Sequence, residues 1–273
     1  MQEAPVRPPA VAGRFYPADP EALAREVDAC LGGEAGSEQV VAGALGCVAP
    51  HAGYQYSGRV AGAVYARLPA RATYLILGPN HFGRGKPLAV MSRGAWLTPL
   101  GPAPIDGSLA DELRRCCPGL EEDAAAHAEH SIEVQVPFLQ RRFGGSIVPV
   151  AIGLDDYAAL VSLGHGVAEA VSRAAKPLLI VASSDFSHYE PDRVTRVKDR
   201  RAIDRILALD PQGLYDVVHR ERISMCGYGP VVAMLVAVRD LGGRQATLVK
   251  YATSADAGGD PDAVVGYAGI VIS

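Results

Sequence analysis

The sequence contains few cysteines, few aromatic residues and no long apolar run. Among its 273 residues are five cysteines, one tryptophan and 6% aromatic residues. The cysteines are odd in number, mostly far apart and without a C-x-x-C pair, which argues against a disulfide framework and a structural zinc site. No stretch approaches the ~20 consecutive apolar residues of a membrane-spanning helix. We therefore expect reduced thiols and no membrane segment.

The balance of charge is slightly acidic. The chain has 26 Lys and Arg against 30 Asp and Glu, a net charge of −4, which argues against a general nucleic-acid binder. Residues 193–209 look basic, but apolar residues recur there at helical spacing and aspartates separate the cations. This pattern predicts the solvated face of an amphipathic helix. The first residues lack a charged-then-apolar signal peptide, so a cytoplasmic protein is expected.

Short apolar runs of strand length recur along the chain. Several are continuous rather than alternating, which is typical of strands buried on both faces. They lie at 46–50, 73–78, 87–91, 146–153, 177–183, 246–252 and 264–272. Residues 87–101 predict a hairpin.

Helical patterns lie between these strands. Asp19 and Pro20 supply a helix start, and Ser57 is expected to cap the helix at 58–68. The helices are expected at 20–31, 58–68, 107–117, 131–143, 155–175, 193–209, 211–221 and 229–241. The alternation predicts an α/β fold with a mostly parallel central sheet and helices on both faces. No repeat or Ser/Gly linker divides the chain, so residues 1–273 are expected to form a single domain.

Three of the seven histidines follow directly after predicted strands. His51 follows GCVAP, His81 follows TYLILGPN, and His188 follows PLLIVASSDFS. In open α/β sheets, ligands bind beyond the carboxyl ends of the strands. If the strands are parallel, the three imidazoles face one crevice. Two histidines and one anionic group make a common open catalytic metal site.

The anionic group has two candidates. Asp185 lies three residues before His188 and could bind a metal or hydrogen-bond an imidazole. Cys226 precedes a helix N-terminus, which stabilises a thiolate. A buried small hydrophobe is the alternative role for this cysteine. The residues alone leave this choice open, and Cys116 and Cys117 have no evident role.

A further polar cluster lies in HAEHSIEVQVPFLQ at 127–140. His130 and Ser131 stand at the start of a helical run, and Glu133 follows within its first turn. Ser131 could cap this helix. The remaining histidines are expected to be surface or structural residues: His127, His165 and His219.

Six blocks of sequence together resemble the MEMO family, whose bacterial members form a gene trio with AMMECR1-like and radical-SAM proteins. The blocks are RPPAVAGRFYP, APHAGYQYSG, LGPNHFG, EHSIEVQVPFL, SSDFSHYE and MCGYGP, in order along the chain. This family is similar in fold to class III extradiol ring-cleavage dioxygenases, which hold iron(II) with two histidines and one carboxylate.

The resemblance implies roles for individual residues. His51 and His81 would be the two metal histidines, and Cys226 would replace the carboxylate. His188 would be the acid/base histidine that does not bind metal, with Asp185 beside it in the catalytic machinery. Further candidates for substrate contact or ligand support are Asn80, His130, Glu133, Tyr54, Tyr189 and Tyr228.

The function implied is a non-haem oxidoreductase that uses Fe(II) on a small aromatic or phenolic substrate, with Zn or Cu as other metals. A thiolate keeps the charge of a carboxylate but is softer and can be oxidised. One alternative is a metallohydrolase with zinc-activated water. The other is a non-enzymatic module that binds a short peptide, copper or iron, since eukaryotic members are discussed in signalling and metal handling. A functional link to AMMECR1-like and radical-SAM proteins is also implied.

Overall fold

The computed structural model of the chain describes residues 5–32 and 39–273. Within these residues a nine-stranded sheet has the order β10-β12-β2-β9-β3-β8-β4-β7, and β11 pairs with β12. The strands are β2 (Gly46–Ala49), β3 (Thr73–Pro79), β4 (Leu88–Val90), β7 (Glu121–Glu122), β8 (Ser146–Ile152), β9 (Leu178–Ser183), β10 (His188–Glu190), β11 (Ala246–Thr253) and β12 (Val264–Ile272).

The four central strands, β2, β9, β3 and β8, are parallel to one another. They are almost entirely buried, as the continuous apolar runs predict. The flanking strands differ, because β12 runs antiparallel to β2 and β4 runs antiparallel to β8. The expected α/β fold is confirmed, with its parallel pairing concentrated at the centre of the sheet.

The expected hairpin at 87–101 is wrong in its position. β4 joins the main sheet, whereas β5 (Ala95–Thr98) and β6 (Gly101–Pro104) form the hairpin. β1 (Val6–Arg7) adds to β5 and completes a separate small sheet. A hairpin is therefore present, but it begins several residues later than the sequence pattern suggested.

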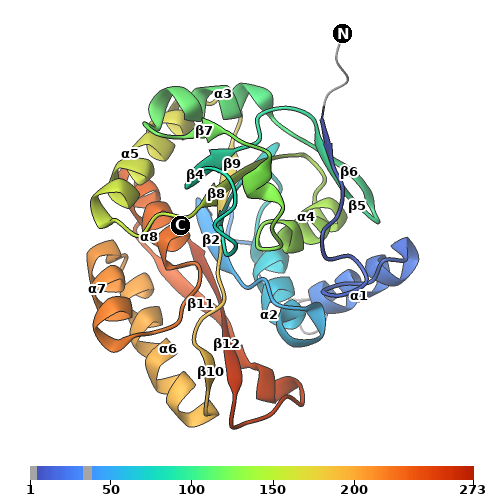
Figure 1. Cartoon of the computed structure of the whole chain (residues 1–273), viewed down its shortest axis with the longest axis vertical. Coiled ribbons are helices and arrows are strands. Elements are labelled where there is room, and N and C mark those ends of the chain that lie inside the picture. The colour runs from blue at the N-terminus through green and yellow to red at the C-terminus, as the bar shows by residue number, and fades with distance from the viewer. Residues whose placement is uncertain (1–4, 33–38) are drawn as a thin grey trace.

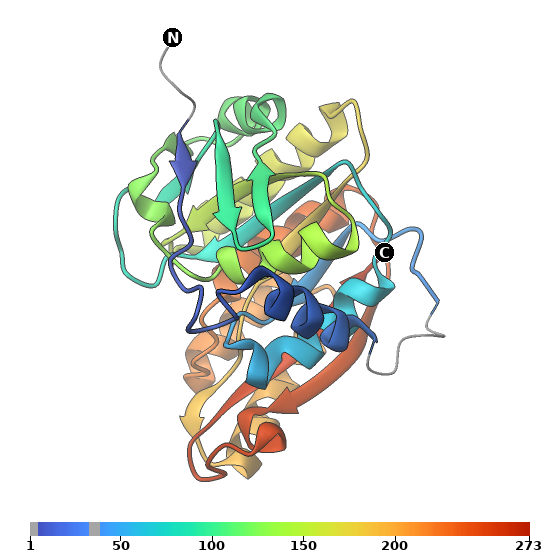
Figure 2. The same ribbon diagram turned by 90° about the vertical axis from the view of Figure 1, so that its right-hand side faces the viewer.

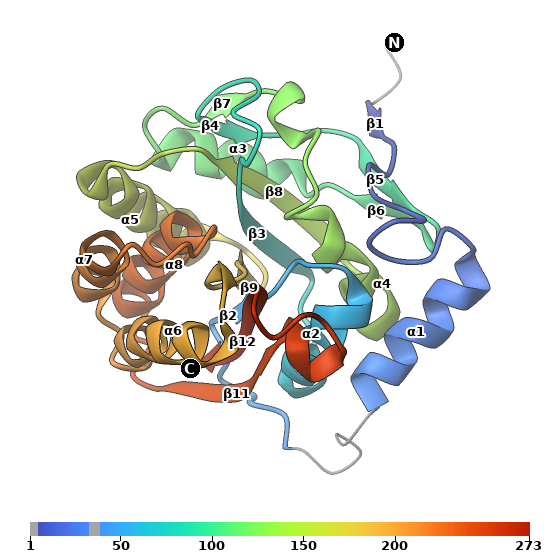
Figure 3. The ribbon, with the colours of Figure 1, turned by 60° about the horizontal axis from the view of Figure 1, so that its bottom comes forward.

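Helices cover both faces of the main sheet (Figure 1). They are α1 (Pro20–Gly32), α2 (Tyr54–Arg67), α3 (Gly107–Cys116), α4 (Val136–Arg142), α5 (Tyr157–Arg173), α6 (Asp192–Leu207), α7 (Pro211–Glu221) and α8 (Tyr228–Asp240). Figure 3 shows α5 to α8 on one side of the sheet and α1, α2 and α4 on the other. Figure 2 views the second layer, with α1 and α2 in blue and α4 in light green.

Helix starts show where local sequence signals decide the boundary. Asp19 accepts a hydrogen bond from the Ala22 N–H, and α1 begins at Pro20 as expected. The expected Ser57 cap is wrong, because α2 begins three residues earlier at Tyr54 and the Ser57 hydroxyl donates to the Ala52 carbonyl. No helix in the described ranges is long and apolar enough to cross a membrane.

A buried ion pair holds the segment before α1 against the rest of the protein. Arg7 lies 2.7 Å from a carboxylate oxygen of Glu133, and its guanidinium also donates to the carbonyls of His127 and Glu129. Glu133 further accepts hydrogen bonds from the Val11 N–H and the Tyr16 hydroxyl. Glu133 therefore anchors the N-terminal segment, which corrects its expected place among the substrate or ligand contacts.

His127 is a buried histidine whose ring nitrogens have no hydrogen-bond partner among the described residues. Its ring packs edge-on against Trp96 at 5.6 Å between centroids. Burial lowers the pKa of His127 to about 3, and the nearby Arg7 guanidinium contributes to that shift. The folded protein therefore holds this imidazole neutral at mildly acidic pH.

We predict that His127 makes the protein less stable in acid. An unfolded His127 takes up a proton as the pH falls through 6.5, whereas the folded one does so only near pH 3. Stability is therefore lost across this window as the pH falls, by about 2 kcal/mol between pH 6.5 and about pH 4.5. In urea unfolding, His127→Leu should no longer lose free energy of unfolding across this pH window. The control His165→Gln, at an exposed site, should lose as much as wild type. Parallel pH profiles for wild type and His127→Leu would contradict this account.

Candidate metal centre

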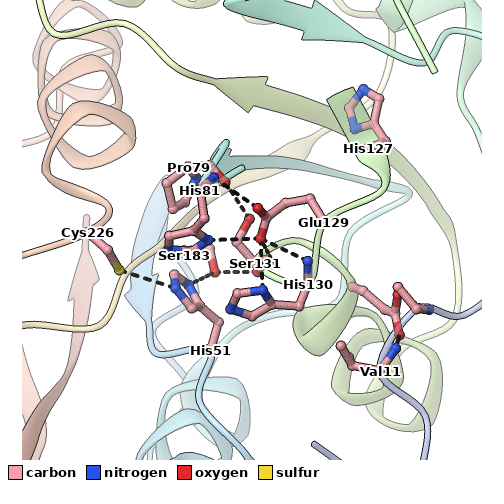
Figure 4. Close-up of polar contacts among 12 residues, drawn as sticks. Val11, His51, Pro79, His81, His127, Glu129, His130, Ser131, Ser183 and Cys226 are labelled. Carbon is pink, nitrogen blue, oxygen red and sulfur yellow. Dashed lines mark hydrogen bonds and ion pairs between the residues drawn. The ribbon is translucent and has the colours of Figure 1, made fainter. Parts of the chain in front are cut away.

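Three loops meet at the carboxyl edge of the parallel strands. His51 follows β2, His81 follows β3, and Asp185 lies between β9 and β10. These strands are neighbours in the order β2-β9-β3, so their loops emerge side by side. Cys226 reaches the same place from the turn before α8, as Figure 4 shows. The fold thus gathers side chains that are far apart in the sequence.

His51, His81 and Cys226 form a compact group of metal-ligand atoms. One ligand atom from each residue lies within 4.8 Å of the others. The Cys226 Sγ is 3.2 Å from the His51 Nε2, and the rings of His51 and His81 are 5.2 Å apart between centroids. Imidazole and thiolate donors at this spacing suit a tetrahedral or open transition-metal site. The three residues could therefore hold one metal ion with little rearrangement.

Cys226 approaches His51 because a glycine follows it. A Cβ at position 227 would lie 2.3 Å from the Ser183 carbonyl oxygen and 2.5 Å from the Ser184 Cβ. The Gly227 N–H also donates to the Ser184 hydroxyl. Only glycine permits the turn before α8 to pack this closely against the end of β9.

The hydrogen bonds around His51 determine its tautomer. Ser183 donates its hydroxyl hydrogen to the Ser131 carbonyl and accepts from the Gln135 amide. The Ser183 oxygen, 2.8 Å from the His51 Nδ1, therefore accepts from an Nδ1–H. The His51 Nε2 is left unprotonated and faces Cys226. Burial lowers the pKa of His51, and repulsion from His130 and His81 lowers it further.

Glu129 orients His81. One carboxylate oxygen of Glu129 lies 2.9 Å from the His81 Nδ1, and the other accepts the His81 N–H. Because a carboxylate accepts hydrogen bonds, the Nδ1 carries the proton and the Nε2 is free to bind metal. Burial raises the pKa of Glu129, but hydrogen bonds from His130 and His81 outweigh it and hold the pKa well below its usual range.

His130 lies against His81 rather than apart from the site. Their rings stack with centroids 4.8 Å apart and planes 8° apart. The His130 Nδ1 is 3.0 Å from Glu129, and Phe15 covers its ring at 4.9 Å. His81, Glu129 and His130 also form a second group of closely spaced ligand atoms. Since Glu129 already accepts the N–H groups of His130 and Ser131, we assign it to supporting His81 rather than to binding a separate ion.

Asp185 and Cys226 lie beside the histidines in a buried setting. Asp185 accepts the main-chain N–H of His51, not an imidazole N–H. Burial raises the pKa of Asp185, although the imidazole of His188 opposes the shift. Burial also raises the pKa of the Cys226 thiol, and the Asp185 charge adds to it. Without a cation nearby, Cys226 is therefore held as a protonated thiol; a bound metal would favour the thiolate.

His188 stands apart from the three ligand candidates with one nitrogen free. Its Nδ1 is 2.8 Å from the Ser224 carbonyl oxygen, so the Nδ1 carries a proton. The Ser224 hydroxyl accepts the His188 N–H and fixes the main chain as well. The Nε2 has no hydrogen-bond partner among the described residues and remains available to accept or deliver a proton.

The other predicted contact residues lie in different places. Asn80 donates its amide to the Arg84 carbonyl and closes the loop that carries His81. Tyr189 is 78% exposed, with its ring 5.7 Å from that of His188. The expectation for Tyr54 is wrong because it is buried and donates to the Val134 carbonyl. The hydroxyl of Tyr228 binds Asp155 and its ring packs near His219, and its role in substrate contact stays a prediction.

Three supporting residues were not found from the sequence: Glu129, Ser183 and Gln135. Each lies beside a residue that the motifs single out, in EHSIEVQ or at the end of β9. Only Glu129 gave a signal, as a carboxylate directly next to the candidate His130. Their partners are far along the chain, so the motif alone does not reveal them.

Fold and site together define an α/β protein that presents two histidines and one cysteine as a candidate metal-binding group. A family model described as Memo-like protein matches residues 7–271. A MEMO1 family protein of Methanosarcina mazei is 48% identical over 270 residues, which cover 98% of this chain and 99% of the relative. One of Methanopyrus kandleri is 45% identical, with 97% and 98% covered. The chain belongs to the MEMO family, which confirms the resemblance found in the six sequence blocks.

A solved structure shares the fold. An uncharacterised protein of Escherichia coli K12 superposes with a TM-score of 0.58 and 15% sequence identity. The match covers 84% of this chain and 99% of the other. At this identity the likeness concerns the fold alone.

We predict that Glu129→Gln weakens metal binding by about 10- to 100-fold, the usual cost of losing a group that orients a ligating histidine. The amide cannot supply the negative charge that fixes the His81 tautomer. Competition with a coloured chelator measures the affinity, and Glu121→Gln, at the exposed strand β7, is the matched control. Equal affinities for wild type and Glu129→Gln would exclude this role.

Proposed function

We propose that this protein is a non-haem, iron(II)-dependent oxidoreductase acting on a small aromatic or phenolic substrate. The observation that carries the proposal is that three ligand candidates and an oriented acid/base candidate lie at the same edge of the sheet. His51, His81 and Cys226 converge on one point, whereas His188 is held with a free Nε2 nearby. A site that only stores metal does not need an oriented acid/base residue beside it.

The donor set fits the proposed metal. Two neutral imidazoles and one thiolate carry a single negative charge, as do two histidines and one carboxylate, and three protein ligands leave positions open. Iron(II) held by these three residues would supply Lewis-acid and redox chemistry toward a phenolic substrate. Zinc and copper also accept these donors, so the ligands by themselves do not select the metal.

The protein's own groups would manage protons and orientation. His188 would take a proton from a substrate hydroxyl at its Nε2 and return it later, because the Ser224 carbonyl fixes the other nitrogen. Asp185 would hold the loop after β2 through the His51 N–H. Burial of His51 and Asp185 keeps bulk water away from this side of the metal centre.

Aromatic side chains near the site favour an aromatic ligand. Phe82 is 59% exposed and lies 6.4 Å from His130, measured between ring centroids. Tyr189 is 78% exposed beside His188. Exposed aromatic rings at the two sides of a site can pack against a flat substrate.

Metallohydrolysis is the alternative that the donor set allows, since zinc with three protein ligands activates water. A module that only binds a peptide, copper or iron is the other. Bound zinc with esterase or amidase activity would favour the first, and metal binding without turnover would favour the second.

We predict that iron-loaded protein binds nitrocatechol and consumes dioxygen in the presence of catechols. His188→Ala should keep its iron but lose at least about 100-fold in turnover, as expected for an acid/base residue. His219→Ala, at the partly exposed histidine near Asp155, is the matched control and should retain activity. Loss of iron from His188→Ala would show that His188 is a ligand. Absence of oxygen uptake by the iron-loaded wild type with any catechol would refute the proposal.

A further inference from the structure

A cavity of about 470 Å³ lies between the start of α2 and strand β11, with η3 (Ser254–Ala257) along one side. Figure 3 shows η3, in red, beside the first turns of α2. Its lining includes Tyr56 and Arg59 of α2, Lys250, Ala252 and Thr253 of β11, and Asp256 of η3. The candidate metal ligands His51, His81 and Cys226 are not part of this lining.

Two cations in this cavity have no counter-ion. Across residues 5–32 and 39–273, the side chains of Arg59 and Lys250 form no ion pair and no hydrogen bond. Asp256 also lines the cavity, but Arg196 already donates to it and it accepts the Thr253 N–H. The lining therefore carries two cations and one carboxylate, a net charge of about +1, in a chain whose net charge is −4.

Strand register places this cavity on the same face of the sheet as Tyr267. On β11 and β12, Lys250 pairs with Gly269 and Ala252 pairs with Tyr267. Directly opposed residues project to one face. A Cβ at Gly269 would meet Val64 of α2, so this is the face that α2 covers. Tyr267 is thus a direct neighbour of the cavity wall.

Tyr267 also reaches toward the metal centre. β12 pairs antiparallel with β2, and the pairing ends at Ile270 and Val48. Tyr267 comes three residues before Ile270 and His51 three residues after Val48, so both lie beyond the same end of this pairing. Burial is the largest cause of the raised pKa of the Tyr267 hydroxyl. Electrostatic interaction raises this pKa further, and the residues close enough to exert it are Asp185, Tyr56 and Tyr189. Tyr56 lines the cavity and Asp185 lies in the metal centre, so Tyr267 stands between the two.

The Tyr267 hydroxyl has no hydrogen-bond partner among the described residues. The residue is 1% exposed and belongs to neither of the two large apolar clusters. None of the described residues hydrogen-bonds its hydroxyl, yet this oxygen is not among the enclosed atoms that lack a partner. The hydroxyl therefore reaches solvent while the ring is buried. A fixed donor in this position can contact a ligand that spans both places.

We propose that the cavity is a subsite for an anionic group, a carboxylate or phosphate, on the same molecule whose aromatic part enters the metal centre. Arg59 and Lys250 would bind the anion, and Tyr267 would donate a hydrogen bond to the linking part of the ligand. This rests on the proposed function and adds the substrate class: an aromatic compound with an anionic tail. An arginine and a lysine together bind such groups through charge-assisted hydrogen bonds.

The test compares Arg59→Ala/Lys250→Ala with Arg25→Ala/Arg220→Ala, which removes the same charge from exposed positions elsewhere. Inorganic phosphate probes the subsite alone, by calorimetry. Nitrocatechol, which has no acidic tail, probes the metal centre in anaerobic, iron-loaded protein. Dihydroxyphenylpropionate probes both together. Wild type should bind phosphate, and the Arg59/Lys250 variant should lose at least about tenfold in phosphate affinity while keeping its affinity for nitrocatechol.

The outcomes separate the two proposals. Equal phosphate affinity in both double variants, or no phosphate binding by wild type, overturns the subsite. If phosphate weakens dihydroxyphenylpropionate but not nitrocatechol, the subsite belongs to the same ligand, as proposed. If phosphate affects neither catechol, the link to the metal centre is wrong. Phosphate binding through Arg59 and Lys250 without any catechol binding would overturn the proposed function but would still support the anion site.

Discussion

The buried carboxylate of Glu129 is the interaction on which the candidate site depends. It accepts the Nδ1–H of His81 and the main-chain N–H groups of His81, His130 and Ser131. One side chain thus joins the loop after β3 to the segment before α4. Arg7 donates to the Glu129 carbonyl and so connects the N-terminal strand to the same point. Loss of this carboxylate would free both imidazoles at once.

Burial favours the neutral forms of three groups in this site when no cation is bound. The Cys226 thiol and the Asp185 carboxyl both have raised pKa values because they are buried. His51 has a lowered pKa for the same reason. The protein therefore favours neutral forms of these groups, and a metal ion would have to displace the thiol proton. Metal affinity should consequently rise with pH.

Much of the fold could be predicted from the sequence because continuous apolar runs mark buried parallel strands. The run at 73–78 is β3 (Thr73–Pro79), for example. The gathering of His51, His81 and Cys226 was also foreseen, partly from family resemblance. Side-chain direction was not: Tyr54 neighbours a motif but points into the core. Glu129 was missed because its partner His81 is 48 residues away.

The central claim is that His51, His81 and Cys226 hold one catalytic iron. The most direct measurement is elemental analysis of protein purified without oxygen, for wild type and Cys226→Ser. The account predicts about one iron per chain in wild type, because three ligands define one site, and little in the variant. Zinc at that occupancy would contradict the oxidoreductase assignment. No metal above background, even after reloading, would contradict the metal centre itself.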